Sequence, residues 1–277
     1  MALSISNAAV QEFQDQFSLT YQSVQSLDGM TMVGHGHVGD AYKIPFMGQV
    51  AMHPRGAYQS IIAATDTPVT RPIVTFSDWT LNIPLDKFQS KLLLGNTLES
   101  IANTQSKSQA RRVCQTKLDA LEADAGTSIP DGGTNLTVDK MKQVMQIFDD
   151  AEVPDGQRYW AMNSSQIKAL LSDNSVTSIL YNQSRTLVNG EIDTFLGFKI
   201  IKIGAMALEG GLPKTGNIRT TYAWAMGAVY TGYRIDPQID VDWSAERQSW
   251  LTISDLAMGT KVTQPLGVAK IDCDESV

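Results

Sequence analysis

The sequence predicts an α+β fold, because stretches with helical periodicity and stretches with strand periodicity are separated by turn residues. Residues 138–148 place apolar side chains at three- and four-residue steps, which is the spacing of an amphipathic helix. Residues 79–85 alternate apolar and polar side chains, which is the spacing of a half-buried strand. Between such stretches, Pro154-Asp155-Gly156 predicts a tight turn, since proline presets φ and glycine tolerates the left-handed region.

Residues 1–29 open with a predicted helix. Apolar residues, Phe13 and Phe17 among them, recur at helical spacing and stop at Leu27-Asp28-Gly29. The opposite side of this helix is polar and rich in Gln and Ser. Two interpretations stay open: a core helix of its own subunit, or an arm that packs on a neighbouring subunit.

Residues 30–85 predict a long extended hairpin, because Gly, Pro, Thr and β-branched residues dominate and charged residues are sparse. An extended hairpin with little apolar mass of its own is not stable in isolation. We therefore expect it to rest on another surface. Its basic residues are interpreted as interface charges, where an arginine can clamp a carboxylate through two hydrogen bonds; these are Lys43, Arg55 and Arg71.

Residues 85–126 predict a long helical region that opens at Leu85-Asp86-Lys87 and has a break at Gly95-Asn96. Its apolar stripe is broken, so we expect a half-polar helix and not a buried core helix. Four basic residues are placed on its polar faces: Lys107, Arg111, Arg112 and Lys117. The pair Arg111-Arg112 either faces nucleic acid or belongs to a solvated helix face.

A boundary is expected at residues 129–133, which hold a proline and two glycines. The stretch 134–173 then predicts the order helix, turn, strand, helix. Asn135 or Thr137 is available as the N-cap of the first helix, and Asn163-Ser164-Ser165 would cap the second.

The remaining chain predicts further strands. Asn189-Gly190 is a turn signal, and the apolar run 198–203 after a glycine predicts a strand. Residues 221–230 form another apolar segment, and 234–243 alternate apolar with polar or acidic residues.

Composition limits the class of protein. The 277 residues suffice for one large domain or two modest ones, and 43% hydrophobic residues can bury a core. A net charge of −7 argues against a protein whose main task is to grip phosphates. Cys114 and Cys273 are too few for a disulfide framework, so we expect reduced thiols. Without a signal-peptide pattern or a membrane-length apolar run, we expect a soluble product of the cytosol.

Candidate chemistry is sparse. Residues 34–39 fit the letters GxGxxG, but a dinucleotide site needs a helix to follow, and the next residues contain a proline and no helical period. His35 and His37 could share a metal with His53, or they could lie in a polar turn before a strand. No GxSxG motif is present. We predict no catalytic residue, no cofactor and no metal site.

A second possible cation site is the acidic stretch near residue 240. Asp236, Asp240 and Asp242 put three carboxylates within seven residues. Hard divalent cations prefer oxygen ligands. The alternative is a strand that exposes its acidic side to solvent.

The stretch 134–173 resembles the axial domain of tailed-bacteriophage major capsid proteins. In that family a strand ends at an Asn-Pro or Asn-Ser cap and leads into a Leu-Leu helix, and here Asn163-Ser164 and Leu170-Leu171 occupy those places. The order of elements is also similar to that of the family, because an extended hairpin precedes a long helix and a strand follows Gly197.

The resemblance implies an α+β phage major-capsid fold, which is shared with encapsulins. Its parts would be an N-terminal arm at 1–29, an extended β-hairpin loop at 30–85, a peripheral domain with a long spine helix at 86–131 and 244–277, and an axial domain at 132–243. Phe13 and Phe17 of the arm, with Lys43, Arg55 and Arg71 of the loop, would be inter-subunit contacts.

The implied function is that of a major capsid protein, not an enzyme. Hexamers and pentamers would form an icosahedral shell around double-stranded DNA bound without sequence specificity, with Arg111 and Arg112 facing the DNA. The arm is too short for a built-in scaffolding domain, so a separate scaffolding protein and a portal are expected partners, and no membrane. The protein would be made in the host cytoplasm and reside in the virion. Two alternatives stay open: an encapsulin-like nanocompartment, and a small metal-dependent enzyme using His35, His37 and Asp40.

Overall fold

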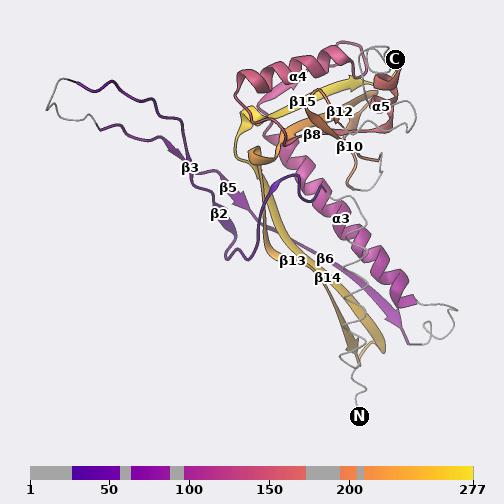
Figure 1. The fold of residues 1–277 in the computed structure, drawn as a ribbon. Coiled ribbons are helices and arrows are strands. Elements are labelled where there is room, and N and C mark those ends of the chain that lie inside the picture. The colour runs from indigo at the N-terminus through magenta and orange to yellow at the C-terminus, as the bar shows by residue number, and fades with distance from the viewer. Residues whose placement is uncertain (1–26, 57–63, 88–96, 173–193, 205–208, 277) are drawn as a thin grey trace.

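Two sheets share one long helix, and a two-stranded loop projects away from both (Figure 1). The computed structural model describes residues 27–56, 64–87, 97–172, 194–204 and 209–276. The predicted N-terminal helix, the predicted break at Gly95-Asn96 and the predicted turn at Asn189-Gly190 lie outside these residues.

The first sheet is mixed and belongs to the body at the top of Figure 1. Its seven described strands follow the order β7-β15-β12-β8-β10-β9, with β11 paired to β12. β8 and β10 run parallel, whereas β12 runs antiparallel to β8 and to β15. The bounds are β7 Thr127–Ile129, β8 Arg158–Met162, β9 Thr194–Phe195, β10 Phe198–Lys202, β11 Lys214–Thr215, β12 Ile218–Ala225 and β15 Val268–Asp274.

Helices α4 (Val138–Asp150) and α5 (Ser164–Leu171) cover one face of this sheet. Phe148 of α4 is fully buried there against Phe198, with ring centroids 5.6 Å apart. Thr137 caps α4 by accepting a hydrogen bond from the Lys140 N–H, and Asn163 forms a capping box with Gln166 at the start of α5. The order helix, turn, strand, helix predicted within 134–173 is confirmed, with β8 as the strand.

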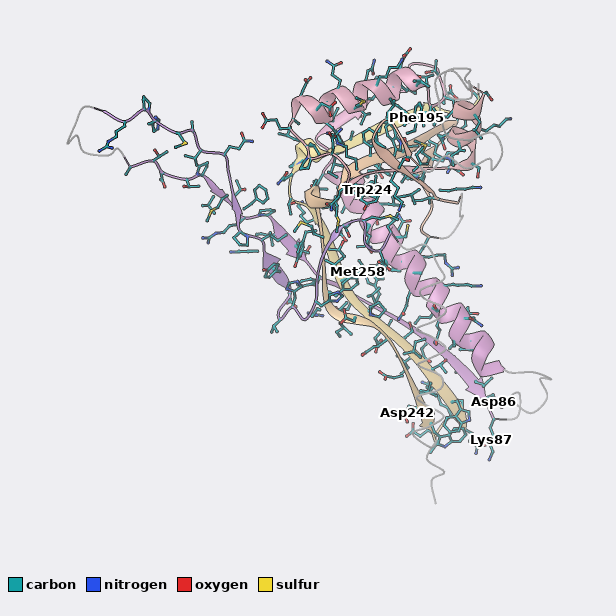
Figure 2. The ribbon with its side chains drawn as sticks, in the orientation of Figure 1. Asp86, Lys87, Phe195, Trp224, Asp242 and Met258 are labelled. Atoms are coloured by element: carbon teal, nitrogen blue, oxygen red, sulfur yellow. The ribbon has the colours of Figure 1, made fainter. Side chains whose placement is uncertain are left out.

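The other face of the first sheet is covered by the C-terminal half of α3 (Thr97–Ala123). Leu118 and Leu121 of this helix pack in one buried cluster with Tyr222 and Trp224 of β12. Figure 2 labels Trp224 inside the body. Because both faces are covered, the first sheet has a complete core within the subunit.

The second sheet is long and antiparallel except for its short edge strand β1. Its order is β1-β13-β14-β6, and β1 runs parallel to β13. The N-terminal half and the middle of α3 lie on one face, where Ala102 packs with Ile239 and Val113 packs with Leu256 and Met258. The bounds are β1 Met32–Gly34, β6 Ser77–Asp86, β13 Val229–Ser244 and β14 Ser249–Val262, with the 3-10 turns η1 Met226–Ala228 and η2 Pro265–Gly267.

The projecting loop consists of two short ladders. β2 (Ala41–Lys43) pairs with β5 (Ile73–Thr75), and farther out β3 (Phe46–Met47) pairs with β4 (Val69–Thr70). Figure 1 shows this loop extending to the left of both sheets. The extended hairpin expected from composition is therefore present within residues 30–85.

Three boundaries differ from the sequence expectations. Leu85 and Asp86 end strand β6 and do not open a helix, because Leu85 is buried in register with Trp250. The segment 221–230 spans the end of β12, the turn η1 and the first two residues of β13, whereas 234–243 lies within β13, which continues through two register shifts near Ile235. β15, expected in the same domain as residues 86–131, pairs with β7 of that range and also with β12, so it lies in the first sheet.

Candidate assembly surfaces

Where the structure describes it, the projecting loop exposes apolar side chains and has almost no core of its own. Met47 is 75% exposed and Met52 is 98% exposed, whereas Val74 at the base of the loop is fully buried. Lys43, Arg55 and Arg71 are exposed along the same loop. Single exposed apolar residues are ordinary, but an extended loop that exposes them without a core gains stability by burying them on another surface.

The long sheet has one side packed against α3 and one side turned away from it. The Thr252 hydroxyl accepts a hydrogen bond from the Gln105 side chain of α3, and Leu256 packs against Val113, so these β14 residues face the helix. Side chains alternate along a strand, and the register of β13 and β6 then defines the opposite side. We call that side the acidic face; it consists of Thr80, Asn82 and Pro84 on β6, Asp240 and Asp242 on β13, and Leu251, Ile253 and Asp255 on β14.

The acidic face carries charge of one sign. The residues that define it include three aspartates, Asp240, Asp242 and Asp255, and no Lys or Arg. Asp240 and Asp242 are exposed, and Leu251 and Ile253 are partly exposed between their neighbours. Figure 2 shows Asp242 and Asp86 at the lower end of this sheet. A row of apolar side chains bordered by carboxylates suits a partner that is both apolar and basic.

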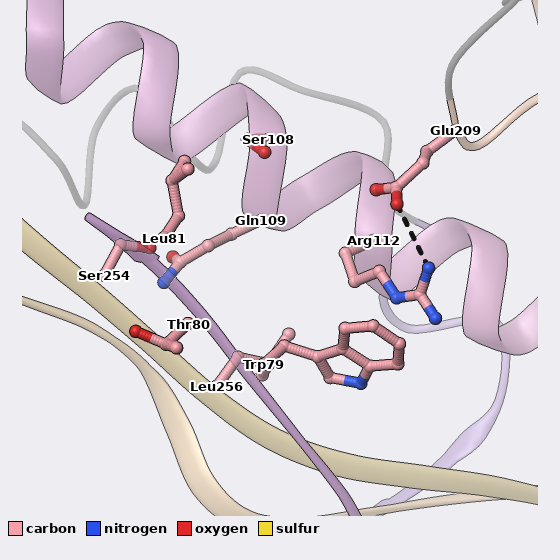
Figure 3. Close-up of a pocket in the computed structure, with 9 residues that line it drawn as sticks. All are labelled: Trp79, Thr80, Leu81, Ser108, Gln109, Arg112, Glu209, Ser254 and Leu256. Carbon is pink, nitrogen blue, oxygen red and sulfur yellow. Dashed lines mark hydrogen bonds and ion pairs between the residues drawn. The ribbon is translucent and has the colours of Figure 1, made fainter. Parts of the chain in front are cut away.

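The two basic residues predicted to face DNA have different surroundings. Arg112 is 22% exposed, pairs with Glu209 at 3.1 Å and lies with its guanidinium carbon 3.3 Å from the ring centroid of Trp79. Figure 3 shows this pair at the rim of a pocket of about 150 Å³ between α3 and the long sheet. Arg111 is partly exposed. The contact of either residue with DNA stays a prediction.

Lys117 was placed on a polar helix face, and this was wrong. Its side chain is fully buried, with Nζ 3.1 Å from the carbonyl oxygen of Leu27 and 3.0 Å from Asp28 Oδ1. Burial lowers the pKa of Lys117, and the nearby Asp28 carboxylate opposes this shift. The ammonium group therefore ties residues 27–28 to α3.

The three histidines do not form a metal site. His35 Nδ1 lies 2.6 Å from Asp236 Oδ1, and His37 Nε2 lies 2.9 Å from the hydroxyl of Tyr230. His53 is exposed in the projecting loop. In the part of the chain that the structure describes, no three His, Cys, Asp or Glu side chains gather as metal ligands. This also covers the acidic stretch around Asp240.

Residues 34–39 do not open a helix, as a dinucleotide site would require. Gly34 ends β1, and Gly39 comes shortly before β2. Cys114 and Cys273 are free and buried, and burial raises the pKa of each thiol to about 11. Neither thiol is therefore a thiolate at neutral pH. No helix in the described residues has both the length and the apolar character needed to cross a membrane.

Sequence reasoning missed the residues that hold the base of the loop. Arg234 of β13 contacts both Asp40 and Asp78, which lie on the two sides of the loop. The signal available in the sequence was a lone arginine at the start of a stretch rich in aspartate. Its partners are too distant in the chain for any local pattern to identify them.

The body, the long helix shared with an elongated sheet, and the projecting loop define the class: an α+β protein with the fold of phage capsid subunits. Solved structures agree. The capsid of Helicobacter pylori bacteriophage KHP30 matches with a TM-score of 0.73 at 9% identity, covering 89% of this chain and 88% of that chain. The KHP40 head matches with a TM-score of 0.72 at 11% identity, covering 88% of each chain. A structure from Mycobacterium phage Che8 matches with a TM-score of 0.65 at 16% identity, covering 84% of this chain and 85% of that chain.

The sequence itself gives the family. A model of the phage capsid protein family matches residues 5–275, so the chain belongs to that family. Its role is that of a phage coat protein, which places it in the virion as a subunit of a multi-subunit shell. A search of curated proteins finds no significant match.

Proposed function

We propose that the protein is the major capsid protein of a tailed phage and forms hexamers and pentamers of an icosahedral shell around double-stranded DNA. The observation that carries this proposal is the projecting loop, whose described residues are extended, expose Met47 and Met52, and form no core of their own. A subunit with such a loop buries apolar surface only by overlapping another copy.

Charge supports the acidic face as the surface that receives the loop. Residues 41–76 contain Lys43, Arg55 and Arg71 against one acidic residue, Asp66, so their formal charge is 3 − 1 = +2. The acidic face offers carboxylates and the apolar pair Leu251 and Ile253. Complementary charge sets register and partner choice more than raw affinity.

The N-terminal arm is a poorer occupant of the acidic face. Residues 1–29 contain Glu12, Asp15 and Asp28 and no Lys or Arg, so their side-chain charge is −3. Like charges across an interface are unfavourable. We place Phe13 and Phe17 of the arm at a different, apolar inter-subunit contact.

The domain assignment follows the two sheets. We assign α4, α5 and the first sheet, β15 included, to the axial domain. We assign α3 and the long sheet to the peripheral domain, with the projecting loop inserted between β1 and β6 and the arm at 1–29. This keeps the expected order of parts, but it moves β7 and β15 to the axial domain and moves β1, β6 and β13 to the peripheral domain.

The contents and partners of the shell complete the proposal. The net charge of −7 disfavours tight binding of DNA by the wall, so the genome is held without sequence specificity. Arg111, partly exposed on α3, is the better candidate for a DNA contact, because Arg112 is committed to Glu209 and Trp79. A separate scaffolding protein and a portal act in assembly, and the chain is made in the host cytoplasm.

Imaging of the purified protein tests this function. The chain is expressed alone and with a candidate scaffold, separated by size and imaged by negative-stain electron microscopy. Closed shells or six-membered rings are expected. A monodisperse monomer under all these conditions contradicts the proposal. Nuclease-protected double-stranded DNA in native particles supports a shell that encloses a genome. Particles that hold a folded enzyme and no DNA would instead support an encapsulin-like nanocompartment.

A further inference from the structure

The base of the projecting loop crosses the long sheet at two facing glycines. Gly232 of β13 and Gly259 of β14 are partners in the strand register. A Cβ atom on Gly259 would lie 2.1 Å from the carbonyl oxygen of Thr75, and one on Gly232 would lie 2.9 Å from a ring carbon of Phe76. Both distances are shorter than carbon contacts allow. Only glycine therefore lets the loop come this close to the sheet.

An arginine holds both strands of the loop beside this glycine pair. Arg234 Nη1 lies 2.9 Å from Asp40 Oδ1, at the entrance to the loop, and its Nη2 contacts the carboxylate of Asp78, at the exit. A planar guanidinium can serve two carboxylates with fixed geometry, which a lysine ammonium cannot do as well. Because Arg234 follows Tyr233 directly on β13, both loop strands are fixed to one point of the long sheet.

Backbone and aromatic contacts complete the joint. The His37 N–H donates to the carbonyl of Tyr233 at 3.2 Å, and the Phe76 N–H donates to the carbonyl of Asp40 at 3.0 Å. The His37 ring lies 4.3 Å from Tyr42 and 5.5 Å from Phe76, centroid to centroid. These contacts link the two strands of the loop to each other and to β13.

We propose that these residues form a rigid joint that sets the direction of the loop in the single chain, before a second copy is met. The joint is defined by Gly232, Gly259, Arg234 and His37, with Asp40 and Asp78. A loop already held in its bound direction loses less conformational freedom on association, which favours assembly without adding a contact. The outer part of the loop, around Met52, is left to adapt to its partner.

The joint is a property of the unassembled chain, while its use in building a shell rests on the proposed function. Hydrogen exchange of the chain, kept unassembled at low concentration, tests whether the joint exists without testing whether it serves assembly. Peptides that cover 40–47 and 72–78 report on the joint, and peptides of β8 and β12 report on the body. In the native protein the joint peptides are expected to be protected against exchange.

Two variants and one matched control define the test. Gly259→Ala and Arg234→Gln are expected to raise exchange of the joint peptides by about tenfold or more while the β8 and β12 peptides stay unchanged. Gly227→Ala is the control, because a Cβ there meets nothing within 4 Å and its backbone is ordinary. It is expected to exchange like the native chain.

The proposal fails if the native joint peptides exchange at unprotected rates, since the loop would then be ordered only on assembly. It also fails if Gly259→Ala and Arg234→Gln both leave the joint peptides as protected as in the native chain. If Gly259→Ala unfolds the body, as faster exchange of the β8 and β12 peptides would show, the exchange of the joint peptides in Arg234→Gln alone decides whether the proposal holds. None of these outcomes depends on whether shells form.

Discussion

Charge reversal across the proposed contact between loop and acidic face gives the sharpest test of how subunits meet. The double change Asp240→Lys and Asp242→Lys puts two positive charges where Lys43 and Arg71 of another copy are proposed to dock. An exposed ion pair stabilises a contact by about 0.2–1 kcal/mol, and a like-charged pair destabilises it by a similar amount. Each reversal therefore changes the binding free energy of a contact by roughly twice that amount, and the two reversals together weaken it by roughly 1–4 kcal/mol. This equals about a fivefold to a thousandfold weaker contact.

The assay is the critical concentration for assembly, measured by light scattering and imaged by negative stain. The acidic-face variant is expected to need a higher concentration, and the effect should shrink as salt screens the charges. Adding Lys43→Glu and Arg71→Glu to the same chain restores opposite charges and should restore assembly. Asp150→Lys is the control, because Asp150 is an exposed aspartate in the last turn of α4, where a cation is favourable.

Two results would refute this reasoning. Assembly of the acidic-face variant at the native concentration would show that Asp240 and Asp242 face no basic partner. Failure of the fourfold variant to assemble, while circular dichroism shows that it remains folded, would show that the loop and the acidic face do not meet.

Two further predictions concern the subunit itself. Phe148→Ala should reduce the free energy of unfolding by about 3–5 kcal/mol, because Phe148 is fully buried against Phe198; chemical denaturation measures this, and a loss below about 1 kcal/mol would contradict the packing. Burial acts to raise the pKa of Glu275, but hydrogen bonds from Arg219 and Lys214 outweigh it and hold this pKa below the usual 4.5. The stability that ionised Glu275 contributes is thus complete above pH 4.5 and is lost as the pH falls through the lower pKa of the folded state. The melting temperature of Glu275→Gln should therefore fall less steeply with acid than that of the native chain. Parallel plots of melting temperature against pH for the two proteins would contradict the assignment.

Local chemistry explains which parts of the fold the sequence predicts. The unit from Thr137 to Leu171 depends on caps, apolar spacing and one turn, all of which are contained in neighbouring residues, and it is observed as expected. The alternation in 79–85 likewise becomes β6. The resemblance to phage capsid proteins is confirmed by the family match.

The missed features depend on contacts between distant residues. Lys117 is buried because Asp28, 89 residues away, offsets the cost of desolvating its charge. The joint depends on Arg234, which meets Asp40 and Asp78 at separations of 194 and 156 residues. Neither pairing leaves a trace in local periodicity, since a lysine or arginine is by default expected at the surface.

The two halves of α3 differ in chemistry, and this difference relates the subunit to its shell. Toward the body the helix packs apolar side chains such as Leu118 and Leu121. Toward the long sheet it packs Ala102 and Val113 against apolar side chains. It also presents Gln105 and Gln109 there, whose amide groups donate to backbone carbonyls of β13 and β14.

Hydrogen bonds contribute less net stability than buried apolar area, because water offers the same bonds to the unfolded chain. At the pocket in Figure 3, Oε1 of Gln109, the hydroxyl of Ser254 and Nε of Arg112 lack a hydrogen-bond partner among the described residues. The contact of α3 with the long sheet is thus more polar than its contact with the body, and the acidic face still exposes Leu251 and Ile253 in part. We therefore expect the long sheet and the loop to gain stability from a neighbouring copy in a shell, whereas the first sheet is already covered on both faces by helices of its own subunit.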